Sequence, residues 1–153
     1  MDAMLAQLDE AWAWHRAAPD EWSAAEVLGH FIHGERTDWI PRARIILEHG
    51  EQRPFEPFDR DGSVAAAAGR TTKELLSTFR SLRTANVEEL RSWNLTEDDL
   101  DRTGTHPAFG PVTMRELLAT WATHDHVHLA QLNQALAQAW AGDVGPWRAY
   151  LWE

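Results

Sequence analysis

The feature that most constrains the fold is a long helical pattern in the last third of the chain. Thr113 and Glu116 form a Thr-x-x-Glu capping box, in which each side chain satisfies a free backbone N–H at the start of a helix. Apolar residues follow at helical spacing, at Leu117, Trp121, Leu132 and Ala135. The pattern predicts an amphipathic helix over residues 113–141, whose apolar stripe must pack against other elements.

Two helices are predicted in the first third of the chain. Apolar residues at spacings of three and four predict a short first helix over residues 2–16. A second capping box, formed by Ser23 and Glu26, opens a helix that we expect to continue to Gly50. Pro41 removes one backbone hydrogen bond and should kink this helix, a complete break being the less favoured alternative.

A long crossover and a third helix are predicted in the middle of the chain. Residues 51–62 contain two prolines and show no periodicity, so we interpret them as a crossover rather than a tight turn. A helix follows over residues 63–93, with Gly69 weakening the prediction for its first turns. Residues 94–110 predict a short turn and a loop. No strand-like alternation of useful length occurs, so the predicted fold is an all-α four-helix bundle with a crossover between its second and third helices.

The C-terminal tail is too apolar to be left in solvent. After Gly142 it contains Trp147, Tyr150, Leu151 and Trp152, and we expect it to fold back on the bundle. Residues 1–153 have the length of one ordinary domain, and an apolar content of 44% with nine Trp is enough for a core. A single domain is therefore predicted.

Composition limits the chemistry and the partners. The chain has no cysteine, so a metal ion must bind to His, Asp or Glu. A formal net charge of −10 opposes binding to nucleic acid or to an anionic membrane surface. No apolar run approaches the roughly 20 residues that cross a membrane, and the acidic start is unlike a signal peptide. The expected partner is a small-molecule substrate, and the expected location is the cytoplasm.

Two histidines share the apolar face of the last predicted helix. His124 and His128 are four residues apart, so their Cβ atoms lie about 5–6 Å apart and both rings can reach one ion. His126 points to another side of the helix and cannot join them. Two inward histidines are equally consistent with hydrogen-bonded core residues, so the pair alone leaves both interpretations open.

A third ligand has to come from another helix. His30 lies on the apolar face of the second helix with Val27 and Phe31, where its ring should enter the same core. His33 could share this face and is a competitor, whereas Glu35 points farther away and is expected to be solvated. We favour His30, His124 and His128 as the metal ligands, because three inward histidines on two helices are hard to explain otherwise.

Three segments give the sequence a family resemblance. They are WSAAEVLGHF at residues 22–31, LRTANVEEL at residues 82–90, and THPAFGPVTMRELLATWATHDHVHLAQL at residues 105–132. With these segments the chain resembles the DinB-like superfamily, which includes thiol-dependent metal S-transferases and bundles like the N-terminal domain of maleylpyruvate isomerase. The resemblance implies up-down-down-up topology and a Ni or Zn ion on His30, His124 and His128 with open coordination positions. It also implies frequent homodimerisation.

The possible reactions follow from an open three-histidine site. Such an ion can lower the pKa of bound water toward ~7 or hold a small thiol as thiolate. The resemblance favours transfer of a low-molecular-weight thiol, such as bacillithiol or mycothiol, to an electrophilic small molecule, or a related isomerisation. Two alternatives stay open: a metal-dependent hydrolase, and a non-catalytic, stress-related bundle in which the metal site is vestigial or only stabilising.

Other residues near the motif have less specific interpretations. Asp125 and Gln131 could orient a metal ligand or a water molecule, although ordinary exposed polar residues are the more common case. Trp22 and Trp121 could line a substrate pocket but are more often core residues. Glu26 is assigned to helix capping, as is Glu116.

Overall fold

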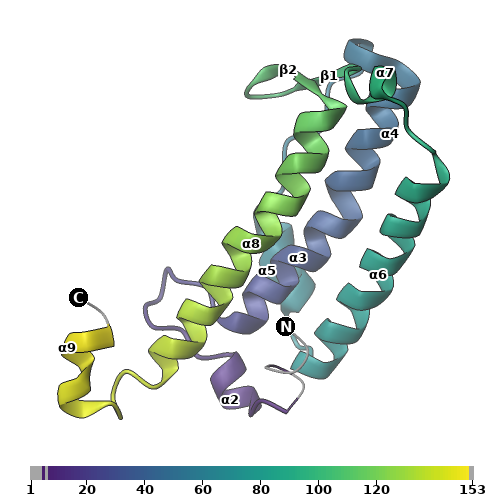
Figure 1. Ribbon diagram of the computed structural model, residues 1–153. Helices are drawn as coiled ribbons and strands as arrows, with labels where there is room; N and C mark the ends of the chain where they lie inside the picture. The colour runs from purple at the N-terminus through teal and green to yellow at the C-terminus, as the bar shows by residue number, and fades with distance from the viewer. Residues whose placement is uncertain (1–4, 6, 152–153) are drawn as a thin grey trace.

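Long helices stand side by side in the computed structural model, which describes Leu5 and residues 7–151 (Figure 1). They are α3 (Ala24–Thr37), α4 (Trp39–His49), α6 (Thr72–Ser92) and α8 (Met114–Ala139). The α3–α4 pair and α6 run in the same direction, and α8 runs in the opposite direction. This is the order of the second, third and fourth helices in an up-down-down-up bundle, as predicted.

The second predicted helix is divided in two rather than kinked at its proline. The division falls at Asp38, which has φ −109° and ψ −74° and lies between α3 and α4. Pro41 therefore occupies the first turn of α4, where the missing N–H removes no hydrogen bond within that helix. The Asp38 N–H donates to Gly34 O, and the Arg42 N–H donates to Asp38 O. Backbone hydrogen bonding therefore continues from α3 into α4 across the division.

The predicted first helix is wrong for most of its described length. Only α2 (Glu10–Ala13) is a complete helix there, and part of the prediction, at residues 1–4 and 6, lies outside the described residues. Glu10 attaches this turn to α6, because its carboxylate accepts hydrogen bonds from the N–H and hydroxyl of Thr72 at the start of that helix. The single turn thus covers one end of the bundle (Figure 1).

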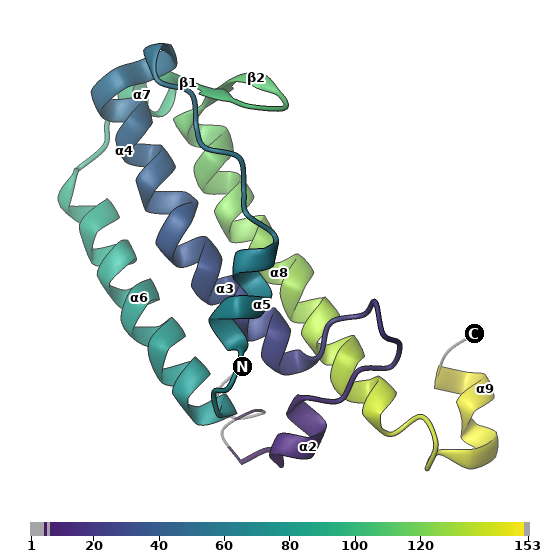
Figure 2. The same ribbon diagram turned by 180° about the vertical axis from the view of Figure 1, so that it is seen from behind.

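The predicted crossover is confirmed. After η1 (Gly50–Gln52), residues 53–60 run back along the bundle to α5 (Asp61–Ala67), as Figure 2 shows. This return brings the chain to the end of the bundle where α3 began. It is the reason that α6 can lie parallel to α3–α4.

The third predicted helix begins later than expected. Gly69 has a φ of +69° and separates α5 from α6. Thr71 then caps α6 in a capping box with Glu74, the same signature that opens α3 and α8. The Thr-x-x-Glu pattern is visible in the sequence and marks the start of α6 more closely than the apolar spacing does.

A short hairpin replaces part of the predicted loop. After α7 (Glu97–Leu100), β1 (Thr103–His106) pairs antiparallel with β2 (Gly110–Thr113), and Gly104 lies opposite Val112. A Cβ atom on Gly104 would lie 2.8 Å from Ile46 Cγ1, so only glycine allows the hairpin to pack this closely on α4. The Phe55 N–H donates to Thr105 O at 2.9 Å and attaches the crossover to the hairpin.

The core consists of two apolar clusters, one toward each end of the bundle. One joins α3, α5, α6 and α8 through side chains that include Phe31, Leu75 and Leu132. The other joins α4, the crossover and α8 through Ile46, Phe55 and Trp121, among others. The part of α8 that carries His124 and His128 lies between Trp121 of one cluster and Leu132 of the other.

The C-terminal tail does not fold back on the bundle, contrary to the prediction. It forms η2 (Gly145–Trp147) and α9 (Arg148–Leu151), which extend away from the long helices (Figure 1). The exposed fractions are 67% for Trp147, 87% for Tyr150 and 58% for Leu151, while Trp152 lies outside the described residues. Among the helices in the described part of the chain, none is both long and apolar enough to cross a lipid bilayer.

Candidate metal centre

Capping boxes begin both of the helices that carry the three histidines, α3 and α8. The Ser23 N–H donates to Glu26 Oε2 at 2.9 Å, while Ser23 Oγ accepts from the Glu26 N–H at 3.3 Å. Thr113 and Glu116 make the equivalent pair of bonds at the start of α8. Both glutamates therefore have the capping role that the sequence predicted.

The three predicted histidines lie together. His30 Nε2 is 2.8 Å from His124 Nε2 and 3.1 Å from His128 Nε2. His30 is buried, and the two histidines of α8 are half-buried. One helix thus contributes a single ring nitrogen and the other contributes two, at the i, i+4 spacing that places side chains on one face.

The Nδ1 atoms of the three histidine rings have different surroundings. His128 Nδ1 donates to Gln131 Oε1 at 2.7 Å, and His30 Nδ1 lies 3.1 Å from Ser63 Oγ in α5. His124 Nδ1 is buried without a hydrogen-bond partner among the described residues. A hydrogen bond at Nδ1 fixes the ring and leaves the Nε2 lone pair available, which is the usual arrangement around a metal-binding histidine.

Two of the rings are held in the neutral form. Burial, with the nearby His128, His124 and His33, lowers the pKa of His30 to about 3. Burial and His128 also lower the pKa of His124 to about 4, although Asp125 acts in the opposite direction. Near neutral pH these imidazoles therefore carry no charge, as metal ligation requires.

A divalent ion fits this arrangement better than hydrogen bonding does. Tetrahedral ligands about 2.0–2.1 Å from a zinc ion lie roughly 3.3 Å from one another, close to the two distances observed here. In a neutral His128 ring that donates from Nδ1 to Gln131, Nε2 has no proton, and His30 Nε2 has at most one hydrogen for two facing nitrogens. Hydrogen bonds alone therefore cannot satisfy the cluster.

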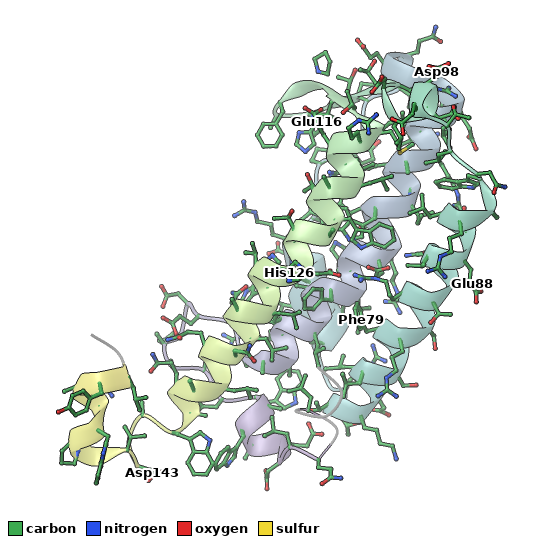
Figure 3. The ribbon with its side chains drawn as sticks, in the orientation of Figure 1. Phe79, Glu88, Asp98, Glu116, His126 and Asp143 are labelled. Atoms are coloured by element: carbon green, nitrogen blue, oxygen red, sulfur yellow. The ribbon has the colours of Figure 1, made fainter. Side chains whose placement is uncertain are left out.

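The other histidines of the two motifs lie outside the cluster. His126 is exposed on α8, where Figure 3 labels it, in agreement with the prediction that it cannot join the pair. The ring of His33, the competitor for the third position, packs against Phe58 at 5.0 Å between centroids. A Cβ on Gly62 would lie 2.3 Å from His33 Cε1, so α5 also confines this ring.

Glu35 is buried, and the expectation that it is solvated is wrong. Its side chain is fully shielded from solvent. Glu35 Oε1 accepts from Arg83 Nη2 at 2.8 Å and from Trp121 Nε1 at 3.1 Å, and Oε2 accepts from Asn86 Nδ2 at 2.8 Å. These donors lie on α6 and α8, far from Glu35 in the sequence, which is why local periodicity could not predict its burial.

Asp125 and Gln131 have different places beside the cluster. Gln131 contacts His128 directly, as one of the two interpretations of the sequence required. Asp125 instead pairs with Arg83, and Nη1–Oδ2 is 2.5 Å. It therefore lies in an ion pair between α8 and α6 rather than in a contact with a histidine ring.

The two tryptophans considered for a pocket also differ. Trp22 lies with its ring 5.1 Å from that of His30 and lines the cleft described below. Trp121 is a core residue that stacks on Trp39 at 6.1 Å. Trp39 in turn contacts the His124 ring at 4.9 Å, so the core cluster supports one of the three histidines.

The histidine cluster opens into a large cleft with a volume of about 1190 Å³. Its walls come from α3–α4, the crossover, the hairpin and α8, and they are mainly apolar. Aromatic side chains contribute much of the lining: Trp22, Trp39, Phe55, Phe58 and Phe109. Gln131, Gln134 and Gln138 add amide groups along α8. Charged side chains also line it: Asp20, Glu21, Asp38, Arg42, Arg60 and Glu116. An apolar cleft with polar groups placed along it is typical of a small-molecule site.

Comparisons with known proteins agree with this picture of the fold. A family model described as the DinB superfamily matches residues 1–132, and none of the curated proteins matches the chain. Among solved structures, the chain is similar to YfiT from Bacillus subtilis, described as "a probable metal-dependent hydrolase with an unusual four-helix bundle topology". The TM-score is 0.69 at 18% identity, over 88% of this chain and 76% of that one. At this identity the similarity shows the bundle fold alone.

Proposed function

The chain belongs to the DinB superfamily, and from this premise we propose that it is a metal-dependent enzyme acting on a small molecule. The proposed ligands are His30, His124 and His128, and the proposed ion is Ni or Zn. The observation that carries the proposal is the convergence of three Nε2 atoms at the wall of a cleft large enough for a substrate. Three protein ligands would leave coordination positions for an exogenous group, which is the pattern of catalytic sites.

The proposed reaction is transfer of a low-molecular-weight thiol to an electrophilic small molecule, or a related isomerisation. When bound, the ion would stabilise the thiolate form of such a thiol, which is the stronger nucleophile. The aromatic side chains of the cleft would hold the electrophile and exclude water from it. Gln131 would keep His128 in the orientation that directs Nε2 at the ion.

Glu35 and Asp125 offer no general base to the cleft, because neither of them lines it. Glu35 and Asp125 both pair with Arg83, and Asp38 pairs with Arg42 at 2.5 Å. Asp38 does line the cleft, and burial raises its pKa above the ordinary value despite the pairing with Arg42, so it could accept a proton from bound water if the reaction is hydrolysis. Addition of a metal-held thiolate to an electrophile needs no protein base for the attacking group, whereas activation of water benefits from one.

Hydrolysis is the second candidate, because YfiT is described as a probable metal-dependent hydrolase. Turnover distinguishes the two reactions. The metal-loaded protein should convert electrophiles such as activated alkenes or epoxides only when a thiol is added. Hydrolysis of ester or amide substrates without thiol would instead support the second candidate. Neither activity in a protein that binds metal would favour a non-catalytic bundle with a stabilising metal site.

The metal site itself is tested by elemental analysis of untagged protein. We expect about one equivalent of Ni or Zn in the wild type and little in His30→Ala or in His124→Ala/His128→Ala. His126→Ala is the matched control, because this exposed histidine lies on the same helix, and it should retain the ion. A wild-type protein that binds no divalent ion after incubation with each would contradict the proposal.

We also propose that the protein forms a homodimer. The support is the exposed apolar tail, in which Trp147, Tyr150 and Leu151 have no cover within the described part of the chain. Sedimentation velocity of the wild type and of a chain ending at Gly142 tests this. A dimer that dissociates on truncation supports a role for the tail, and a monomeric wild type contradicts the proposal.

A further inference from the structure

A buried ionic cluster lies beside the histidines. Glu35 of α3 is its centre, with hydrogen bonds from Arg83, Asn86 and Trp121. Arg83 of α6 uses Nε and Nη2 for Glu35 and both Nη1 and Nη2 for Asp125 of α8. The guanidinium of Arg83 thus connects α3, α6 and α8. We call the three residues Glu35, Arg83 and Asp125 the clamp.

The clamp is well shielded, and its guanidinium is charged. The exposed fractions of its side chains are 0% for Glu35, 25% for Arg83 and 24% for Asp125. Burial lowers the pKa of Arg83, but hydrogen bonds to Asp125 and Glu35 outweigh that effect and hold it above the ordinary value. A planar guanidinium can serve two carboxylates at once because its five N–H groups point in fixed directions.

The metal-binding part of α8 packs on the bundle through partly buried side chains, among them Leu129 and the rings of His124 and His128 against Phe31. Between Trp121 and Leu132, a length of about 16 Å, no residue of α8 is buried. His124 and His128 lie within this stretch, with their Nε2 atoms facing His30 Nε2. Before an ion binds, a single proton cannot serve both close pairs of nitrogens, so the contact between α8 and α3 gains little from the rings themselves and needs support from other side chains. Asp125, next to His124, supplies a contact through Arg83 to the same helix that carries His30.

We propose that Arg83 is a positioning residue for the metal centre: through Glu35 and Asp125 it holds α8 against α3 so that His124 and His128 face His30 before the ion binds. This inference rests on the proposed metal site. It predicts that loss of the clamp weakens metal binding even though no clamp residue is a ligand. Mutation of residues that orient metal ligands without binding the ion commonly changes the metal affinity by about 10–100-fold.

The charge of Arg83 and its proposed positioning role predict opposite effects of Arg83→Met on metal affinity. Arg83 is close enough to His124 to lower the pKa of that ring, so its positive charge also opposes a bound cation. By charge alone, Arg83→Met should strengthen metal binding. If Arg83 positions the ligands, Arg83→Met should weaken it, by about 10-fold or more.

The experiment is a titration of metal-free protein with Co²⁺, followed by visible absorption. Wild type, Arg83→Met and Arg44→Met are compared, with helical content checked by circular dichroism. Arg44 is the matched control because it makes a bidentate pair with Glu89 between α4 and α6, away from the histidines. We expect Arg83→Met to raise the Kd for Co²⁺ by 10-fold or more and to alter the absorption bands, and Arg44→Met to change the Kd less than about 2-fold.

Other outcomes would overturn the inference or its premise. Binding of Co²⁺ by Arg83→Met as tight as by the wild type overturns the positioning role and leaves the metal site standing. If Arg83→Met does not fold, Arg83→Lys replaces it, since lysine keeps the charge but lacks the fork that serves two carboxylates. An unchanged Kd in Arg83→Lys overturns the role as well. A wild type that binds no Co²⁺ overturns the proposed metal site itself.

Discussion

Gln131 Oε1 accepts a hydrogen bond from His128 Nδ1 at 2.7 Å, so a ring of the candidate metal centre is oriented by a residue from the next turn of α8. The two residues are three apart, a spacing at which side chains on a helix are neighbours. The same helix thus supplies both a candidate ligand and the group that fixes its tautomer.

Replacing this amide should weaken metal binding. Gln131→Ala removes the acceptor from His128 Nδ1, and we expect the Kd for Zn²⁺ to rise by about 10-fold. Gln134→Ala is the control, since Gln134 lines the cleft but makes no hydrogen bond to a histidine within the described part of the chain. Competition with a chromophoric chelator measures both affinities. Equal affinities in the two variants would show that the bond to Gln131 has no role in binding.

The stability of the metal-free protein should fall in mild acid. His30 and His124 have pKa values of about 3 and about 4 in the folded state, against about 6.5 when unfolded. Below pH 6.5 the unfolded chain binds protons that the folded chain excludes, so the free energy of unfolding decreases as pH falls from 6.5 toward 4. Urea denaturation at pH 7 and at pH 5 tests this, and His30→Gln should show a smaller difference. Identical urea midpoints for the wild type at both pH values would contradict the lowered pKa values.

A methyl group on Gly29 should separate α3 from α5. An added Cβ would lie 2.5 Å from Ser63 O and 2.8 Å from Ala67 Cβ, so the helices must move apart. We expect Gly29→Ala to reduce the free energy of unfolding by about 1–3 kcal/mol. Gly142→Ala is the control, because an added Cβ there meets no atom within 4 Å. Urea denaturation of both variants provides the measurement, and equal stability would contradict such close packing.

Two phenylalanines of the cleft should respond differently to truncation. Phe55 is only 2% exposed and packs the crossover against the apolar cluster of α4 and α8 that contains Ile46 and Trp121. Phe55→Ala should therefore lower the free energy of unfolding by about 3–5 kcal/mol. Phe109 at the hairpin tip is 78% exposed, and Phe109→Ala should change stability by less than about 0.5 kcal/mol. Thermal unfolding of both variants tests the contrast. A large loss of stability in Phe109→Ala would mean that the hairpin tip is buried in solution.

The sequence predicted the long helices well where periodicity and caps agreed. The helix over residues 113–141 is α8 to within two residues at its C-terminal end, because a capping box and an apolar stripe define it locally. The grouping of His30, His124 and His128 was predictable for the same reason. Each side chain lies on an apolar helix face, and the bundle leaves one interior for both faces.

The failures involve contacts between distant segments. The burial of Glu35 depends on Arg83, which lies 48 residues later, and no local pattern signals that pairing. The hairpin depends on the backbone bond from Phe55 and on the close approach of Gly104 to Ile46. Its strands have four residues each, too few to show alternation. The division of the third predicted helix is different, because it follows local signals: Gly69 with a φ of +69° and the capping box of Thr71 and Glu74.

The crossover has a consequence for how such a protein can change during evolution. Residues 53–60 have to travel back along the bundle because α6 is parallel to α3–α4, and on this path they form one wall of the cleft. The three histidines lie on helices instead. Insertions or substitutions in the crossover and the hairpin can therefore reshape the cleft while the histidine cluster keeps its geometry, so new substrate preferences can arise without rebuilding the metal centre.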